Sequence, residues 1–144
     1  LAPRAVAGQV RVDVVAPAPG PVLVTDGERV RQMVDALADN ALRVLTPGDP
    51  LVLGCQELPG GGVRVEVRDG GPGLAPEELA VAFHRGELSE RYRGRRPVGS
   101  GVGLALVGEL ARRLGGSAAA SPAPEGGVRF AIDLPPAPPA RTLP

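Results

Sequence analysis

Residues 63–74 read VRVEVRDGGPGL. Three valines alternate with charged residues, and this period of two predicts a half-buried β-strand. Asp69 ends the strand in phase with the valines, so its carboxylate is expected on the buried face, where it needs hydrogen-bond donors. Two interpretations stay open. Asp69 either opens an Asx turn, or it accepts a hydrogen bond from an amine of a ligand, which the following glycines allow close to the backbone.

The other elements follow from the same kind of pattern. Alternating apolar residues predict strands, apolar residues three and four apart predict helices, and Gly and Pro mark the turns. Because strands and helices interleave without a regular β-α-β alternation, we predict an α/β two-layer sandwich, with a mixed β-sheet covered on one face by about three helices. Strands are expected at residues 10–14, 22–24, 51–57, 63–69, 117–121 and 127–134, and helices at 26–45, 76–83 and 102–114.

The chain is 144 residues long, which is the length of one domain. Its first residue is Leu and no signal peptide is visible, so we expect a fragment of a longer protein. Residues 1–135 are expected to form the domain, and residues 136–144 a disordered, Pro-rich tail. Residues 84–98 are polar and arginine-rich, and a loop of this length inside a domain is usually functional or disordered.

Composition excludes several classes of function. All 16 basic residues are arginine, so the Gly-Lys-Ser/Thr of a P-loop is absent. One cysteine and one histidine form neither a disulfide framework nor a zinc site, and a free thiol suits a reducing compartment. With 16 acidic residues, the chain lacks the basic face of a nucleic-acid binder. No apolar run approaches the about 20 residues that span a bilayer, so we expect a cytoplasmic domain without contact to nucleic acid or membrane.

A second candidate residue lies in the helix expected at 26–45. Asn40 is on the rim of its apolar stripe, and Arg43 follows one turn further on. An Asn inside a helix lowers stability, so its presence needs a reason. Asn40 is either a solvent-facing polar residue or a hard oxygen ligand for Mg²⁺, which combines few protein ligands with phosphate oxygens and water.

The third candidate is the stretch GSGVGL at residues 99–104, where the helix expected at 102–114 begins. Backbone N–H groups at a helix N-terminus bind phosphate, and glycines leave room for it. A Rossmann fingerprint is excluded, because no strand precedes the stretch and Leu104 stands where the third glycine belongs. The stretch is therefore a candidate phosphate site.

Taken in order, four motifs resemble those of one family. Residues 39–43 (DNALR) resemble the N box of sensor histidine kinases, residues 69–74 (DGGPGL) their DxGxG box, Phe83 their F box, and residues 99–104 (GSGVGL) their GTGLGL box. The resemblance covers about residues 9–135. It implies the catalytic ATP-binding domain of these kinases, which has the Bergerat-type fold shared with gyrase-like ATPases.

The resemblance also implies the cofactors, ATP and Mg²⁺, and a role for each matching residue. Asn40 would hold magnesium, Arg43 would contact phosphate, and both would be the catalytic residues. Asp69 would accept a hydrogen bond from the adenine amino group, and residues 84–98 would form a mobile lid over the nucleotide. The other implied site residues line the adenine pocket (Gly71, Gly73 and Leu74) or wrap the triphosphate (Gly99, Ser100, Gly101, Val102, Gly103 and Leu104).

The partners that the resemblance implies are two. One is the protein's own dimerisation domain, which is expected upstream of Leu1 and whose histidine receives the γ-phosphoryl group. The other is a cognate response regulator. Ala36 stands where related ATPases carry a general-base Glu, which predicts slow hydrolysis. Val44 and Val128 also differ from residues frequent in the family. Two other functions stay open: a serine kinase of the anti-sigma-factor type, and a nucleotide-binding scaffold without phosphotransfer.

Overall fold

The secondary structure is described for residues 11–17, 20, 23–84 and 102–136 of a computed structural model. Valine-rich runs with alternating burial form strands, and the longer apolar stripes form helices. In chain order, the elements are β1 (Arg11–Val15), α2 (Gly27–Leu42), β2 (Pro50–Glu57), β3 (Val63–Asp69), α3 (Pro76–Ala80), α5 (Val102–Arg113), β4 (Ser117–Pro122) and β5 (Val128–Leu134).

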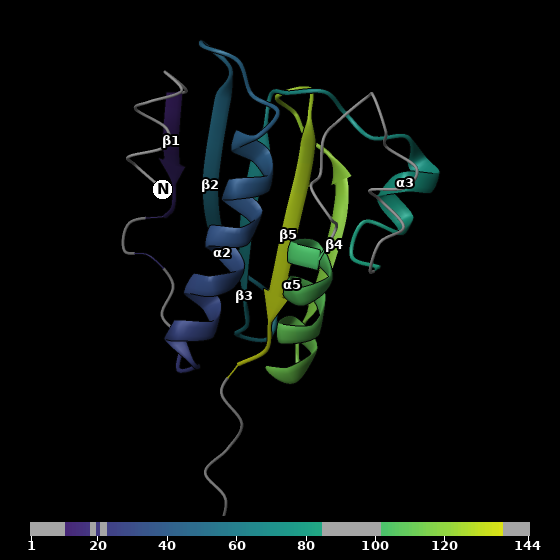
Figure 1. Cartoon of the computed structure of the whole chain (residues 1–144). Helices are drawn as coiled ribbons and strands as arrows, with labels where there is room; N and C mark the ends of the chain where they lie inside the picture. Colours follow the sequence, from purple (N-terminus) through teal and green to yellow (C-terminus); the bar gives the residue numbers. More distant parts are fainter. Residues whose placement is uncertain (1–10, 18–19, 21–22, 85–101, 137–144) are drawn as a thin grey trace, which may run out of the picture.

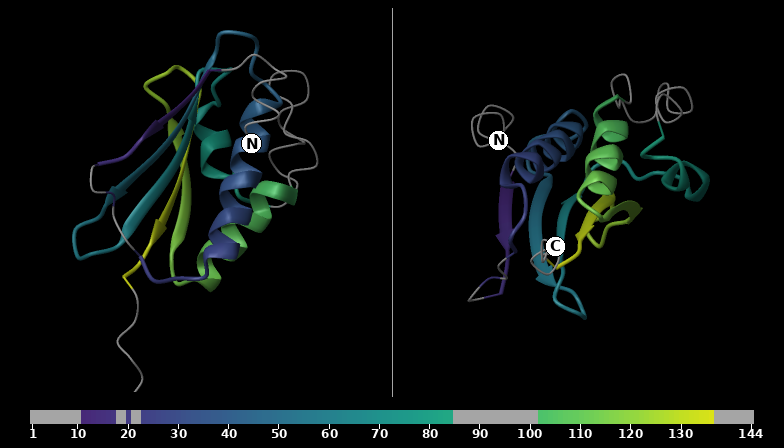
Figure 2. Two further views of the ribbon diagram at one scale, coloured as in Figure 1. Left: turned by 90° about the vertical axis from the view of Figure 1, so that its left-hand side faces the viewer. Right: turned by 90° about the horizontal axis from the view of Figure 1, so that it is seen from below.

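The five strands form one sheet in the order β1-β2-β3-β5-β4 (Figure 1). β1 is parallel to β2, and the other pairs are antiparallel, so the sheet is mixed and β3 lies at its centre. The left view of Figure 2 shows the helices of the described part of the chain on one side of the sheet. The predicted α/β two-layer sandwich is confirmed.

The core lies between the sheet and the helices α2 and α5. Phe130 of β5 is fully buried at its centre, and its ring meets that of Phe83 edge to face, with 5.9 Å between the ring centroids. Each large apolar side chain removed from water here contributes about 1.5–3 kcal/mol. The other large, fully buried side chains are Met33, Leu37, Leu51, Val67, Leu104, Val107, Val128 and Ile132.

Helix α2 begins as expected but ends early. Asp26 caps it by accepting a hydrogen bond from the Arg29 N–H at 3.2 Å. The helix ends at Leu42 and not at about residue 45, because the Val44 N–H donates to the carbonyl of Ala41 (3.1 Å) and closes a tighter turn. Val44 and the residue after it thereby leave the helix and turn toward the end of β3.

Two further predictions about the elements are wrong. Leu23 and Val24 belong to no strand: Leu23 packs against the core as a single anchor, while the Val24 side chain is 77% exposed. The helix expected at residues 76–83 stops at Ala80 and continues as a turn. Within the described residues, no helix has the length and apolar composition needed to cross a bilayer.

Candidate functional site

The Asp69 carboxylate ends the central strand β3 and is fully buried, as the alternation predicted. Its Oδ1 accepts hydrogen bonds from two backbone N–H groups, those of Gly71 at 3.1 Å and Val128 at 3.4 Å. The bond from Gly71 forms the Asx turn that is one of the two interpretations of Asp69. Because backbone donors satisfy and orient this oxygen, the carboxylate is a fixed acceptor at the edge of the core.

Two glycines explain how the backbone approaches this carboxylate so closely. A side chain on Gly127 would overlap the Asp69 carboxylate and main-chain carbonyl. A Cβ on Gly71 would lie 3.1 Å from a methyl carbon of Leu45, 3.2 Å from one of Val44 and 3.3 Å from Asp69 Oδ1. The end of α2, the loop after β3 and the start of β5 therefore meet at Asp69.

Asn40 lies in α2, one helical turn before Val44, and is buried to 7% exposure. Within the described residues, its side-chain oxygen Oδ1 has no hydrogen-bond partner. A buried amide oxygen without a donor costs about 1–3 kcal/mol, so an interaction with a ligand would recover energy here. The interpretation of Asn40 as a solvent-facing residue is wrong, and an oxygen of this kind fits Mg²⁺, which prefers oxygen ligands.

Arg43 caps the C-terminus of α2, and its side chain is half exposed. Its guanidinium engages Asp39 one turn earlier, with Nε 3.2 Å from Oδ2. Exposed pairs of this spacing contribute about 0.3–0.5 kcal/mol. Arg43 therefore follows Asn40 closely in the sequence, but its side chain pairs with the Asp39 carboxylate.

The structure describes some of the remaining predicted site residues but not all of them. Gly73 is exposed, and a Cβ at this position would lie 3.5 Å from the carbonyl oxygen of Gly126. Leu74 is half buried and packs against the core. At the start of α5, Gly103 is exposed and has open space around it, whereas the Leu104 side chain is buried in the core and leaves only its backbone for a ligand. Residues outside the described part are Gly99, Ser100, Gly101, the side chain of Val102, and the lid residues 85–98.

Sequence reasoning missed an ion pair that flanks this site. Arg68, next to Asp69, donates from Nε to Oε1 of Glu125 at 3.1 Å and from Nη2 to Oε2 at 3.2 Å. Burial alone would raise the pKa of Glu125, but the hydrogen bonds and charge of Arg68 outweigh it and hold that pKa below its ordinary value of 4.5. The residues are 57 positions apart, and nothing in their local sequence indicates the pairing.

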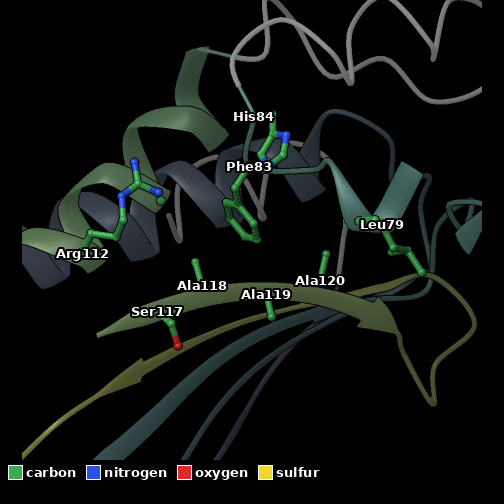
Figure 3. Close-up of a pocket in the computed structure, with 10 residues that line it drawn as sticks. Leu79, Phe83, His84, Arg112, Ser117, Ala118, Ala119 and Ala120 are labelled. Atoms are coloured by element: carbon green, nitrogen blue, oxygen red, sulfur yellow. The ribbon is translucent and has the colours of Figure 1, made fainter. Parts of the chain in front are cut away.

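A cavity of about 400 Å³ lies between α3, α5 and β4 (Figure 3). The Phe83 ring points into it from above, and Ala118 and Ala120 lie on the strand below. Arg112 on its rim already pairs with Glu109 at 2.8 Å. His84 is the first residue of the predicted lid and Phe83 is the F-box residue, but none of the residues predicted to contact the nucleotide or Mg²⁺ lines the cavity, so it lies apart from the Asp69 site.

Comparisons with known proteins show what this chain is similar to. Residues 25–138 match the family described as histidine kinase-, DNA gyrase B-, and HSP90-like ATPase. The sensor histidine kinase component HK1 of Mycobacterium tuberculosis is 41% identical over 115 residues, which cover 79% of this chain. Full-length ShkA in complex with AMPPNP is 30% identical with a TM-score of 0.77 over 92% of this chain. The ATP-binding domain of PrrB from Mycobacterium tuberculosis is 27% identical with a TM-score of 0.66, over 88% of this chain and 82% of that domain.

The chain spans 66% of the length of HK1 and 27% of ShkA, so it matches one part of each longer protein. The family match covers most of the chain and includes both Asn40 and Asp69. The resemblance drawn from the sequence motifs is therefore confirmed. The chain belongs to the histidine kinase-, DNA gyrase B- and HSP90-like ATPase family, and its relatives include sensor histidine kinases.

Proposed function

We propose that this chain is the ATP-binding catalytic domain of a two-component sensor histidine kinase. It would present Mg²⁺-ATP for transfer of the γ-phosphoryl group to a histidine on a separate dimerisation domain. The observation that carries the proposal is the buried Asp69 carboxylate, whose Oδ1 is fixed by two backbone N–H groups. A fixed, buried acceptor recognises an amino group such as that of adenine and rejects a carbonyl in its place. The relative ShkA was solved with the ATP analogue AMPPNP, which supports a nucleotide as the ligand.

Asn40 is the protein ligand that we propose for Mg²⁺. Its buried Oδ1 lacks a partner among the described residues, and a single amide oxygen suits an ion that takes its other ligands from phosphate and water. Bound there, the ion would neutralise charge on the phosphates. Asn40 itself would fix the position of the phosphate end relative to Asp69.

The other roles in the site follow from position. Arg43 would exchange its weak, exposed pair with Asp39 for a phosphate oxygen, to which a guanidinium binds through two N–H groups. Residues 99–104 would surround the triphosphate at the N-terminus of α5, where backbone N–H groups favour anions. Gly71, Gly73 and Leu74 would line the adenine pocket, and residues 84–98 would cover the nucleotide.

The phosphoryl acceptor is proposed to lie outside this chain. His84 is followed by Arg85 and Gly86, whereas the acceptor of sensor histidine kinases precedes an acidic residue. The partners would therefore be the dimerisation domain of the same protein and a cognate response regulator, and the domain would work in the cytoplasm. Ala36, one turn before Asn40, offers no general base for water, so the domain would retain ATP for transfer.

Phosphotransfer in trans tests the proposal. The chain, labelled ATP, Mg²⁺ and the dimerisation domain of the same protein are incubated, and acid-labile, base-stable label on that domain is measured. We expect weak labelling, because a covalent tether normally supplies a high local concentration. Label on a serine of an added protein would favour the serine kinase instead, and nucleotide binding without any transfer would favour the scaffold.

A further inference from the structure

We propose that the ion pair between Arg68 and Glu125 positions the Asp69 carboxylate and thereby sets the preference of the site for a purine with an amino group. This inference rests on the function proposed above, in which Asp69 recognises adenine. Arg68 and Glu125 are positioning residues: they act on Asp69 through the turn between β4 and β5, residues 123–127.

The pair lies on the opposite side of β3 from the Asp69 carboxylate. Arg68 and Asp69 are neighbours in one strand, so their side chains leave it on opposite faces. Asp69 faces the helices, and Arg68 lies on the other face, where its guanidinium holds both carboxylate oxygens of Glu125. A two-bond fork fixes orientation as well as distance, so it limits how far the turn that carries Glu125 can move.

The same turn reaches Asp69 through its backbone. The Gly127 N–H donates to the Asp69 carbonyl at 3.0 Å, and the N–H of Val128 donates to Oδ1. Within the turn, Gly126 N–H donates to the Ala123 carbonyl and Ala123 N–H to the Gly127 carbonyl, each at 3.0 Å. The turn therefore holds the end of β3 by an ion pair on one face and by backbone hydrogen bonds at Asp69.

Burial makes this pair stronger than the surface pairs of the chain. The side chains of Arg68 and Glu125 are 18% and 17% exposed, so salt and water screen them little. Glu66 lies 3.5 Å from Arg68 but also pairs with Arg129 at 3.0 Å. Without the carboxylate at position 125, Arg68 would share one acidic partner with a second guanidinium, and the turn would lose its anchor.

The distance at Val128 makes Asp69 sensitive to the turn. Its N–H donates to Oδ1 across 3.4 Å, which is long for a hydrogen bond of this type. A small displacement of the turn would break this bond and remove one of the two N–H groups that converge on Oδ1. The carboxylate would then be oriented less firmly toward an amino group of the base.

Selectivity between ATP and ITP tests the inference, since ITP carries a carbonyl where ATP carries the amino group. Calorimetry on the whole chain with Mg²⁺ gives both dissociation constants, and their ratio measures recognition of the amino group. Glu125→Gln, and Arg68→Lys as a variant that keeps the charge, should each reduce the ratio of Kd for ITP to Kd for ATP about three- to tenfold, as expected for part of one hydrogen bond.

Asp133→Asn is the matched control. It breaks the pair between Arg64 of β3 and Asp133 of β5 (2.7 and 2.9 Å), which lies on the same face of β3 as Arg68 but at the other end of that strand. Asp133→Asn should keep the wild-type ratio of Kd for ITP to Kd for ATP, although this variant and the variants of Arg68 and Glu125 all lower the unfolding temperature. This separates positioning of Asp69 from a general loss of sheet stability.

Three outcomes would overturn the inference. A wild-type ratio near one would refute adenine recognition by Asp69, and with it the proposed function. A clear wild-type preference for ATP that Glu125→Gln and Arg68→Lys leave unchanged would refute only the positioning role. A reduction of equal size in Asp133→Asn would show that the ratio follows sheet stability and not the turn.

Discussion

Asp69→Asn should weaken the binding of Mg²⁺-ATP about 10- to 150-fold while the domain stays folded, because the variant loses a charge-assisted hydrogen bond of about 1.5–3 kcal/mol. The Asn side chain keeps a carbonyl oxygen for the N–H groups of Gly71 and Val128, at 3.1 and 3.4 Å in the wild type. Its NH₂ group replaces the other carboxylate oxygen, and an NH₂ group accepts no hydrogen bond from an adenine amine.

Alanine is the less informative substitution at this position. Asp69→Ala would leave the N–H groups of Gly71 and Val128 without their acceptor, and each such buried group costs about 1–3 kcal/mol. Domains of this size are stable by only about 5–15 kcal/mol in total. Loss of binding in the alanine variant would therefore mix unfolding with loss of recognition.

Calorimetry with ATP and thermal unfolding of the same samples provide the measurement. The wild type should also bind GTP much more weakly than ATP, because GTP presents a carbonyl at the corresponding position of the base. An Asn variant that is folded and binds ATP within about threefold of the wild type would contradict the assignment of Asp69, since that change is below 1 kcal/mol.

Asn40→Ala should abolish the dependence of ATP affinity on Mg²⁺ and the labelling in trans. The domain should not lose stability, because the substitution removes a buried oxygen that has no partner among the described residues; a Mg²⁺ titration retaining its wild-type effect would contradict this. Gly127→Ala should destabilise the domain by more than about 2 kcal/mol in denaturant unfolding, because its methyl group meets the Asp69 carboxylate. In acid unfolding, the wild type should lose stability as the pH falls from about 4.5 through the lowered pKa of Glu125, because protonation of this carboxylate breaks its pair with Arg68. Glu125→Gln, which has no carboxylate to protonate at this position, should lose less stability over the same pH range. The chain incubated alone with labelled ATP should acquire no base-stable label, and label on His84 would overturn the proposed position of the acceptor.

The sequence predicted those parts of the fold that local patterns determine. The alternation in β3 gave both the strand and the burial of Asp69, and the apolar stripe of α2 placed Asn40 close to the core. Leu23 and Val24, expected in a strand at residues 22–24, belong to none, because an apolar run becomes a strand only where a neighbouring strand is available for pairing. Pairing partners are a property of the whole sheet and are not visible in a run of three residues.

The candidate site was predictable as a set of residues but not as an arrangement. The motifs indicated Asp69 and Asn40, yet the donors to Asp69 come from Gly71 and also from Val128, which lies 59 positions further on. Sequence reasoning treated Val128 only as a difference from the family, because it considered the side chain and not the backbone N–H. The Arg68–Glu125 pair likewise depends on the antiparallel register of β3 and β5, which brings distant residues together.

The backbone hydrogen bonds from Gly127 and Val128 to Asp69 have a consequence for folding during synthesis of the chain. Asp69 obtains backbone partners from residues that the ribosome adds almost 60 positions later, so this contact is among the non-local ones that form slowly. Helix α2 and the β2–β3 hairpin can form while the chain is still being synthesised. The set of backbone donors to Asp69, the proposed acceptor for the base, is complete only after β5 has emerged and paired with β3. If Asp69 recognises the base as proposed, a nascent or truncated chain that ends before Gly127 would carry the nucleotide motifs without a finished pocket, and it would not hold ATP through Asp69 before the domain is whole.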